Sequence, residues 1–237
     1  MIAVWKREFS GYFTTLIGYV YLAIFYIFSG IFFYFNGLQP QYADVGSLFL
    51  GMFSVIMYLL PVLTMRMFSE DKKWGTDQLL YTSPASTRSI VFGKFLAAFS
   101  VYLIAISMLL VYCFIFTIYS VSSQDWGLIL SSFIGILLLG AAMIAIGGFL
   151  SAVTENQIIA AISTFAISLF LNMTGAIAPL LPATWMQNIF NGISFSVRYN
   201  PFVYGLVDLS SVVFFLSLCF LFLFYCVRTI EHRRYVD

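Results

Sequence analysis

Residues 65–84 have the sequence MRMFSEDKKWGTDQLLYTSP, a polar segment that separates two long uncharged stretches of the chain. Such a concentration of charge in an otherwise apolar chain indicates a loop in water, and exposed loops are where proteins commonly bind partners. We therefore expect residues 66–94 to form a loop that binds a component of the aqueous phase. Its charged side chains include Arg66, Glu70, Asp71, Lys72, Lys73 and Asp77.

The composition of the whole chain indicates an integral membrane protein. Of its 237 residues, 62% are hydrophobic and only 9% are charged, whereas about a quarter of the residues in soluble domains are charged. The mean hydropathy is +0.97. The length suits a single membrane domain, residues 1–237, with too few polar residues for an additional soluble catalytic domain. A formal net charge of +1 indicates no preference for nucleic acid.

Uncharged stretches define six expected membrane spans. A helix needs about 20 apolar residues to cross a bilayer, and a Lys, Arg or Asp at its centre costs about 2.5–3.5 kcal/mol. No stretch alternates between apolar and polar residues as barrel strands do, so the predicted fold class is an all-α integral membrane protein. The expected spans are residues 16–35, 47–65, 95–119, 128–153, 158–178 and 209–227.

The basic residues predict the orientation of these spans, because the cytoplasmic loops of membrane proteins are rich in Lys and Arg. With both termini in the cytoplasm, Arg198 is the only one of the 11 basic residues placed outside. An odd number of spans would divide the basic ends of the chain between the two sides. We therefore predict a multi-pass protein of the cell membrane with both termini cytoplasmic. The basic residues placed inside are Lys6, Arg7, Arg66, Lys72, Lys73, Arg88, Lys94, Arg228, Arg233 and Arg234.

Two further segments are expected at the membrane surfaces. In residues 2–13, apolar side chains from Ile2 to Phe13 recur at intervals of three and four, which predicts an amphipathic elbow helix on the inner surface. The alternative is a frayed start of the first span. Residues 179–205 are apolar but interrupted by proline and glycine. We expect short extracytoplasmic re-entrant helices there, because a seventh span would disturb the charge balance.

Motifs that would indicate ATP binding or catalysis are missing from the sequence. There is no G-x-x-x-x-G-K-[ST] loop, since Gly93 and Lys94 lack the upstream glycine. The single histidine, His232, excludes an H-E-x-x-H zinc site and a Ser–His pair within the membrane. No carboxylate lies deep in an expected span, which argues against an ion-coupled transporter. We expect neither enzymatic activity nor a metal site.

The local pattern of the loop predicts two short helical pieces. Residues 70–73 suit a charged helical turn that Gly75 would end. Thr76 can cap a second helix, which would expose residues 79–80 and end before Pro84. We expect this helix, held between two spans, to transmit the movement of a docked partner. The alternative is an ordinary amphipathic loop that rests on lipid.

The start of the third span is expected to carry a cap and a basic residue. Ser86 or Thr87 can cap its first turn. The side chain of Lys94 is expected to extend from the apolar helix toward the membrane surface. Together these residues would mark the boundary between the loop and the bilayer.

Small and polar residues distinguish the fourth and fifth spans. Small residues recur at intervals of four in the fourth span and permit close helix packing, which we expect within the chain more than between two copies. In the fifth span, Asn172 and Thr174 are candidates for a substrate path or a dimer interface, although an interhelical hydrogen bond is the commoner role. The small pairs are Ala141 and Ala145, Gly147 and Ser151, and Gly148 and Ala152.

The loop resembles the cytoplasmic loop of ABC-2 type transporter permeases, whose pattern is approximately E-(E/D)-(R/K)-x-x-G-T-x-(E/D/Q)-L-L-x-T-x-P. Residues 6–23, KREFSGYFTTLIGYVYLA, resemble the N-terminal elbow and first span of this family. Residues 151–157, SAVTENQ, resemble an inner loop of the subgroup that contains gliding-motility-type permeases. An acidic residue is common where this chain has Gln78. The residues that match the pattern are Glu70, Asp71, Lys72, Gly75, Thr76, Gln78, Leu79, Leu80, Thr82 and Pro84.

The resemblance implies a permease subunit that forms a dimer with a second permease chain, identical or different. Each permease would dock a cytoplasmic ABC ATPase that uses ATP and Mg, whereas this chain would bind no cofactor. The helix of residues 76–83 would be the coupling helix, seated in a groove of the ATPase. The residues implied in coupling are Glu70, Asp71, Gly75, Thr76, Asp77, Gln78, Leu79, Leu80, Thr82, Ser83 and Pro84.

The sequence therefore predicts the permease of an ATP-driven exporter. Its cargo would be amphipathic, lipid-like, a peptide or a polysaccharide, because the lack of buried charge disfavours a small inorganic ion. One alternative is a membrane scaffold in which the ATPase works an extracytoplasmic accessory protein instead of moving cargo. Another is a membrane-embedded lipid-modifying enzyme, which would need a His, Asp or Glu cluster outside the charged loop, and the sequence has none.

Overall fold

The computed structural model describes residues 1–38, 44–75, 86–119 and 125–236. All regular secondary structure in these ranges is helical, which confirms the predicted fold class. Within these ranges, six helices are long and apolar enough to cross a membrane. They are α2 (Leu16–Phe33), α3 (Val45–Thr64), α6 (Thr87–Tyr119), α7 (Trp126–Val153), α8 (Gln157–Ile177) and α11 (Leu209–Val236).

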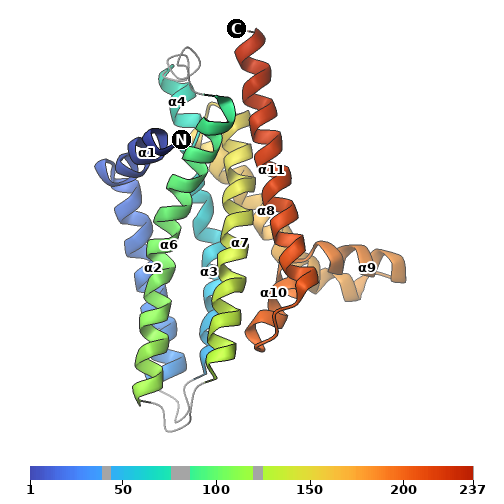
Figure 1. Ribbon diagram of the computed structural model, residues 1–237. Coiled ribbons are helices and arrows are strands. Elements are labelled where there is room, and N and C mark those ends of the chain that lie inside the picture. Colours follow the sequence, from blue (N-terminus) through green and yellow to red (C-terminus); the bar gives the residue numbers. More distant parts are fainter. Residues whose placement is uncertain (39–43, 76–85, 120–124, 237) are drawn as a thin grey trace.

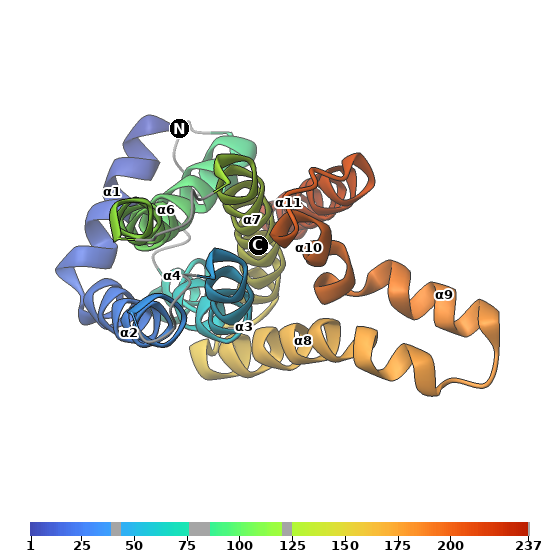
Figure 2. The same cartoon turned by 90° about the horizontal axis from the view of Figure 1, so that it is seen from below.

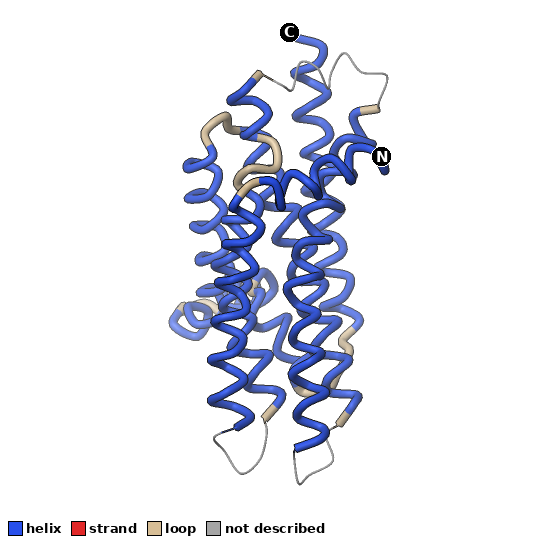
Figure 3. The backbone as a smooth tube through the Cα atoms, turned by 90° about the vertical axis from the view of Figure 1, so that its left-hand side faces the viewer, coloured by secondary structure: helices blue, strands red, loops and turns tan. Residues whose placement is uncertain are grey.

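Shorter helices lie at both ends of the bundle formed by these six. α1 (Ile2–Thr14) lies across one end, where both chain termini and α4 (Ser69–Trp74) are also found (Figures 1 and 3). The opposite end holds a π-helix, and the segment between α8 and α11 projects from the side of the bundle (Figure 1). These elements are η1 (Tyr34–Leu38), η2 (Ala178–Leu180), α9 (Thr184–Ile193) and α10 (Phe195–Val203).

The spanning helices agree with the expected spans to within two residues, except at the start of α6 and the end of α11. α6 begins at Thr87, before the expected start at residue 95, and α11 continues to Val236, past the expected end at residue 227. Ser86 lies at the start of α6, where its Oγ accepts a hydrogen bond of 3.3 Å from the backbone N–H of Ser89. Hydropathy locates the part of a helix that lies in the bilayer, whereas backbone hydrogen bonding continues into water.

Helices also occupy the two segments expected at the membrane surfaces. α1 covers the segment expected to be amphipathic, and α9 and α10 lie within the segment expected to be re-entrant. Figure 2 shows α9 and the end of α8 extending sideways from the bundle. Their positions relative to a bilayer remain predictions.

α7 is the central helix of the bundle. It packs against α3, α6, α8, α10 and α11 (Figure 2). Glycine permits the close approach of two of these neighbours. A Cβ atom on Gly140 would lie 2.1 Å from the ring of Tyr102 in α6, and one on Gly147 would lie 2.2 Å from Thr64 Oγ1 in α3. Gly147, one of the small residues noted in the sequence, thus packs within the chain.

Candidate functional site

The described part of the polar segment lies at the end of the bundle that carries α1 (Figure 1). The chain leaves α3 at Thr64, turns through residues 65–68 and forms α4. Gly75 ends α4 with a φ of 66°, in the left-handed region that glycine adopts without strain. The charged helical turn and its glycine stop are therefore present as the sequence predicts.

A serine of α7 holds the corner between α3 and α4. The Oγ of Ser151 accepts hydrogen bonds of 3.0 Å from the backbone N–H groups of Phe68 and Ser69, and donates one of 3.0 Å to the carbonyl oxygen of Met65. Ser151 has no exposed surface. Because the first N–H groups of a helix lack partners within it, Ser151 supplies from another helix the acceptor that a cap would supply.

A second contact joins α4 to the end of α7. The Nζ of Lys72 donates a hydrogen bond to the carbonyl oxygen of Ala152, next to Ser151. The corner therefore has two polar attachments to one helix, one through its backbone and one through a side chain of α4. This arrangement sets the direction in which α4 leaves the bundle.

Lys94 of α6 lies inside the protein, where it joins three elements. Its Nζ lies 2.6 Å from Oδ2 of Asp71 in α4 and 3.2 Å from Oε2 of Glu8 in α1. It also donates a hydrogen bond of 2.8 Å to the carbonyl oxygen of Met67. Only 2% of the residue is exposed. A buried ammonium group is stable only when it is paired and hydrogen-bonded, and this site supplies both.

The expectation that Lys94 extends toward the membrane surface is therefore wrong. That expectation assumed that the only favourable surroundings for the ammonium group were water and lipid headgroups. The fold instead brings two carboxylates and a carbonyl oxygen to it. Glu8 also pairs with Arg7, so the group of Arg7, Glu8, Asp71 and Lys94 has balanced charge.

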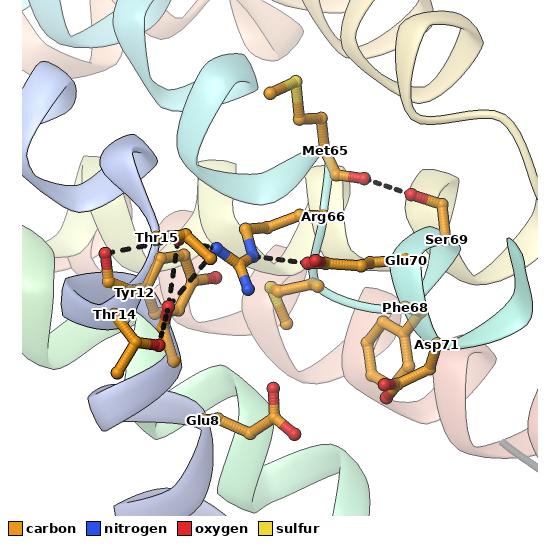
Figure 4. A network of polar contacts seen from close by, with 12 residues as sticks. Glu8, Tyr12, Thr14, Thr15, Met65, Arg66, Phe68, Ser69, Glu70 and Asp71 are labelled. Carbon is orange, nitrogen blue, oxygen red and sulfur yellow. Dashed lines mark hydrogen bonds and ion pairs between the residues drawn. The ribbon is translucent and has the colours of Figure 1, made fainter. Parts of the chain in front are cut away.

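Arg66 forms a second attachment between α1 and the corner, shown in Figure 4. Its guanidinium pairs with Glu70 at 2.6 Å and donates hydrogen bonds to Thr15 Oγ1 and to the carbonyl oxygen of Gly11, the latter at 3.4 Å (Figure 4). The same group lies 5.2 Å from the centre of the Tyr12 ring. Arg66 therefore holds the end of α1 against the α3–α4 corner.

Tyr12 also joins α1 to the end of α3. Its hydroxyl donates a hydrogen bond of 3.2 Å to the carbonyl oxygen of Leu63 near the end of α3. Burial raises the pKa of the Tyr12 phenol above its ordinary value, and the neighbouring Arg66 opposes this only in part. The phenol is thus neutral at physiological pH and remains a donor.

These side chains line a small polar recess of about 230 Å³ at this end of the bundle. Trp74, the last residue of α4, lies at the edge of this recess, and 71% of its surface is exposed. Trp and Arg are enriched at protein–protein interfaces, whereas Lys, Glu and Asp are depleted, so the exposed Trp is the feature of this recess that suits contact with another protein. The lining residues are Arg7, Glu8, Gly11, Arg66, Glu70, Asp71, Trp74 and Lys94.

Part of the predicted coupling site can be placed. Glu70 and Asp71 belong to the two ion-pair groups, and Gly75 ends α4. The assignment of these residues to coupling remains a prediction. The others, Thr76, Asp77, Gln78, Leu79, Leu80, Thr82, Ser83 and Pro84, lie outside the described residues.

Several residues of this cluster are not predictable from local sequence. Glu8, Tyr12 and Ser151 are far along the chain from the polar segment, and no spacing rule relates them to it. Lys94 did carry a signal, because a single charge within an apolar helix requires a partner. The identity of that partner depends on how the helices pack.

Asn172 and Thr174 of α8 occupy different surroundings. The Nδ2 of Asn172 donates a hydrogen bond of 3.1 Å to the hydroxyl of Tyr58 in α3. Thr174 is buried, and its Oγ1 donates to the carbonyl oxygen of Leu171 in its own helix at 2.8 Å. Their role at a substrate path or dimer interface remains a prediction. Within the described ranges, no group of three or more His, Cys, Asp or Glu side chains is arranged to hold a metal.

Comparison with known proteins identifies one family. A sequence model described as "ABC-2 family transporter protein" matches residues 27–227 of the chain. This range begins within α2, at residue 27, and includes α3, α6, α7, α8 and α11 up to residue 227. No curated protein matches the chain.

Proposed function

Because the chain belongs to the ABC-2 family of transporter proteins as a membrane permease, we propose that it converts the movement of a separate cytoplasmic ABC ATPase into export. The ATPase would bind ATP and Mg, and this chain would bind neither. A second permease chain, identical or different, would complete the transport unit. The gliding-motility subgroup remains a prediction, as does the nature of the cargo.

The observation that carries this proposal is the attachment of the α3–α4 corner to three helices. Ser151 of α7 accepts hydrogen bonds from its backbone, and Lys94 of α6 forms an ion pair with Asp71. Arg66 donates a hydrogen bond to α1. These contacts are buried or half-buried, so water competes with them less than it would at an exposed site. A push on the loop that follows α4 would therefore move α1, α3, α6 and α7 together.

In thermodynamic terms, the ATPase needs a different affinity for two conformations of the permease. A ligand shifts a conformational equilibrium only by the difference between its binding free energies in the two states. The proposed coupling helix, residues 76–83, would bind the ATPase with a different affinity in each of the two conformations. The recess beside Trp74 supports a docking surface that extends from this helix onto α4 and α1.

The location of the site supports the proposed orientation. α1 and both termini lie at one end of the bundle (Figure 3), and the cluster contacts α1 through Lys94 and Arg66. Ten of the 11 basic residues were assigned to this side on the basis of sequence. We propose that this end faces the cytoplasm and that the protein resides in the cell membrane.

A second candidate function, mechanical work on an extracytoplasmic accessory protein, is favoured by the segment between α8 and α11. α9 in this segment extends sideways from the bundle (Figures 1 and 2), and none of its residues is buried. Trp185 is among its exposed side chains. A projecting helix of this kind can serve as a lever for a partner outside the cell, as well as an anchor in the outer leaflet.

The proposal is tested by purification of the tagged protein from its native membrane in mild detergent, with mass spectrometry of the chains that copurify. We expect a stoichiometric ATP-binding subunit in the parent. Leu79→Asp together with Leu80→Asp should remove that subunit and leave membrane insertion intact. The matched control is Leu206→Asp with Val207→Asp, two exposed residues between α10 and α11, away from the polar segment.

The outcomes distinguish the candidates. Retention of the ATPase by the Leu79 and Leu80 double variant would contradict the coupling assignment. Purification without any ATPase would favour a scaffold that acts alone or a membrane-embedded enzyme. A large copurifying extracytoplasmic chain, with no cargo movement in reconstituted vesicles, would favour the second candidate function.

A further inference from the structure

A groove of about 340 Å³ lies between the start of α6 and the end of α11, outside the cluster described above. One wall is almost entirely apolar, and the polar side chains all belong to the end nearest the chain termini. Phe92 of α6 and Val227 of α11 lie just below this end. The complete lining is Arg88, Phe92, Phe220, Leu223, Phe224, Val227, Arg228 and Glu231.

The apolar wall has the length of a lipid chain segment. Phe220 is 72% exposed, and Phe92 and Phe224 are also exposed. From Phe220 to Arg228 the helix rises about 12 Å at about 1.5 Å per residue. Half of a hydrocarbon core of about 30 Å is about 15 Å. The wall therefore matches most of one leaflet in depth, and its exposed aromatic rings would lie against acyl chains.

The charged end of the groove lies where a lipid headgroup would be. Arg88 is exposed and forms no ion pair with any other residue that the structure describes. Arg228 pairs with Glu231 at 3.4 Å and lies over the ring of Phe224, at 5.3 Å from its centre. One of the two guanidinium groups is thus neutralised by a neighbouring carboxylate, while the other is not.

This arrangement is complementary to an anionic phospholipid. The lining has a net charge of one positive unit, from two arginines and one glutamate. The N-terminus of α6, beside Arg88, adds a positive partial charge. Guanidinium groups bind phosphate oxygens through two parallel hydrogen bonds, and basic pockets between membrane helices are typical sites for anionic headgroups. A purely apolar partner would offer no anionic group to pair with the guanidinium of Arg88.

We propose that this groove binds one phospholipid of the inner leaflet that carries an anionic headgroup. The phosphate lies between Arg88 and Arg228, and one acyl chain packs along the wall from Val227 to Phe220. The assignment to the inner leaflet rests on the proposed orientation, but the site does not depend on coupling to an ATPase. Bound lipid would connect the first turn of α6, next to the loop, with α11.

The test is native mass spectrometry of the delipidated full chain in detergent, titrated with phosphatidylglycerol or with phosphatidylcholine of identical acyl chains. We expect the parent to bind one phosphatidylglycerol about fivefold more tightly than phosphatidylcholine, since one basic residue near a membrane surface adds about that factor. Arg88→Gln should abolish this preference, with a larger loss of affinity for phosphatidylglycerol than for phosphatidylcholine, whose headgroup has no net charge. Phe220→Ala should weaken the binding of both lipids.

Two matched controls separate the groove from general effects. Lys6→Gln removes another exposed positive charge at the same end of the bundle and should retain the preference. Phe114→Ala removes an exposed phenylalanine elsewhere on α6 and should leave both affinities unchanged. All four variants change exposed side chains, so monodisperse protein with an unchanged thermal midpoint is expected and is checked first.

Three results would overturn the proposal. Equal affinity of the parent for the two lipids would exclude an anionic site. Equal losses in Arg88→Gln and Lys6→Gln would show diffuse surface attraction instead of a defined site. A parent dimer that Phe220→Ala converts to monomers would identify the groove as an interface between two copies of the chain.

Discussion

The Nζ atom of Lys94 lies 2.6 Å from Oδ2 of Asp71, and this ion pair joins the two ends of the loop proposed to bind the ATPase. Asp71 lies in α4 before the loop and Lys94 in the first turns of α6 after it. Because this ion pair holds α4 and α6 together on either side of the loop, a partner docked on the loop would move both helices. Glu8 adds α1 to the same group at 3.2 Å.

Removal of the charge at Lys94 should destabilise the protein. Lys94→Met leaves the carboxylates of Asp71 and Glu8 without their shared partner. Loss of one member of a buried pair typically costs about 3–5 kcal/mol, and we expect about 2–3 kcal/mol here because both carboxylates are partly exposed. The measurement is the thermal midpoint in detergent.

The control for this change is Lys73→Met, the same substitution at an exposed position of α4. We expect its thermal midpoint to stay close to that of the parent. Similar midpoints for the two variants would show that the buried ion pairs of Lys94 contribute no net stability.

Ser151→Ala should loosen the α3–α4 corner. The variant leaves the backbone N–H groups of Phe68 and Ser69 without an acceptor in a buried place, which costs about 1–3 kcal/mol. We expect a lower thermal midpoint and faster hydrogen exchange at these two amides. Ser163→Ala is the control, because that hydroxyl bonds only to a carbonyl oxygen of its own helix; amide protection at the corner that is the same in both variants would refute the role of Ser151.

Gly147→Ala should disturb the contact between α7 and α3. Its Cβ atom would lie 2.2 Å from Thr64 Oγ1, so side chains or backbone must shift, and such overpacking costs about 1–3 kcal/mol. Gly192→Ala in α9 is the matched control, since nothing lies within 4 Å of the added Cβ. Alanine is also the better helix former, so this control should be neutral or slightly stabilising. The prediction fails if both substitutions leave the thermal midpoint unchanged.

Tyr12→Phe should have a pH-dependent effect on stability. Near neutral pH the loss of the hydrogen bond to Leu63 costs about 1 kcal/mol. Burial raises the pKa of Tyr12 in the folded protein above its ordinary value, so folding opposes ionisation of this phenol. The stability that the phenol contributes is complete below the unfolded pKa of about 10 and declines as the pH rises above it.

The deficit of the Tyr12→Phe variant should therefore shrink between pH 8 and pH 11. The measurement is the difference in thermal midpoint between parent and variant across this range, in which the contributions of the other tyrosines cancel. A deficit that stays constant or grows at alkaline pH would contradict the inferred burial of the phenol.

Much of the architecture follows from the order of residues along the chain. Uncharged runs long enough to cross a bilayer predicted the six spanning helices found in the described part of the chain, since the energetic cost of a charge in lipid is a local property. Gly75 predicted the end of α4 because the left-handed backbone it adopts is a local requirement. Ser86 at the start of α6 is a similar case.

The cluster at the end of the bundle was predictable only in part. Glu70 and Asp71 belong to a recognisable motif. Arg66 precedes Glu70 by four residues, an interval at which side chains on a helix pair, whereas the separation of Lys94 from Asp71 indicates no particular pair. Ser151 appeared in the sequence as a small packing residue, and its hydroxyl also serves as the acceptor for two amides of α4.

The sequence by itself determined the class of the protein, the number of spanning helices and its family, because these depend on hydrophobicity and on motifs that are contiguous in the chain. The tertiary structure alone decided that Lys94 is buried between Asp71 and Glu8, and that Arg88 and Arg228 meet at one groove. The physical reason is that the cost of an isolated charge is local, whereas its compensation depends on which distant helices pack side by side.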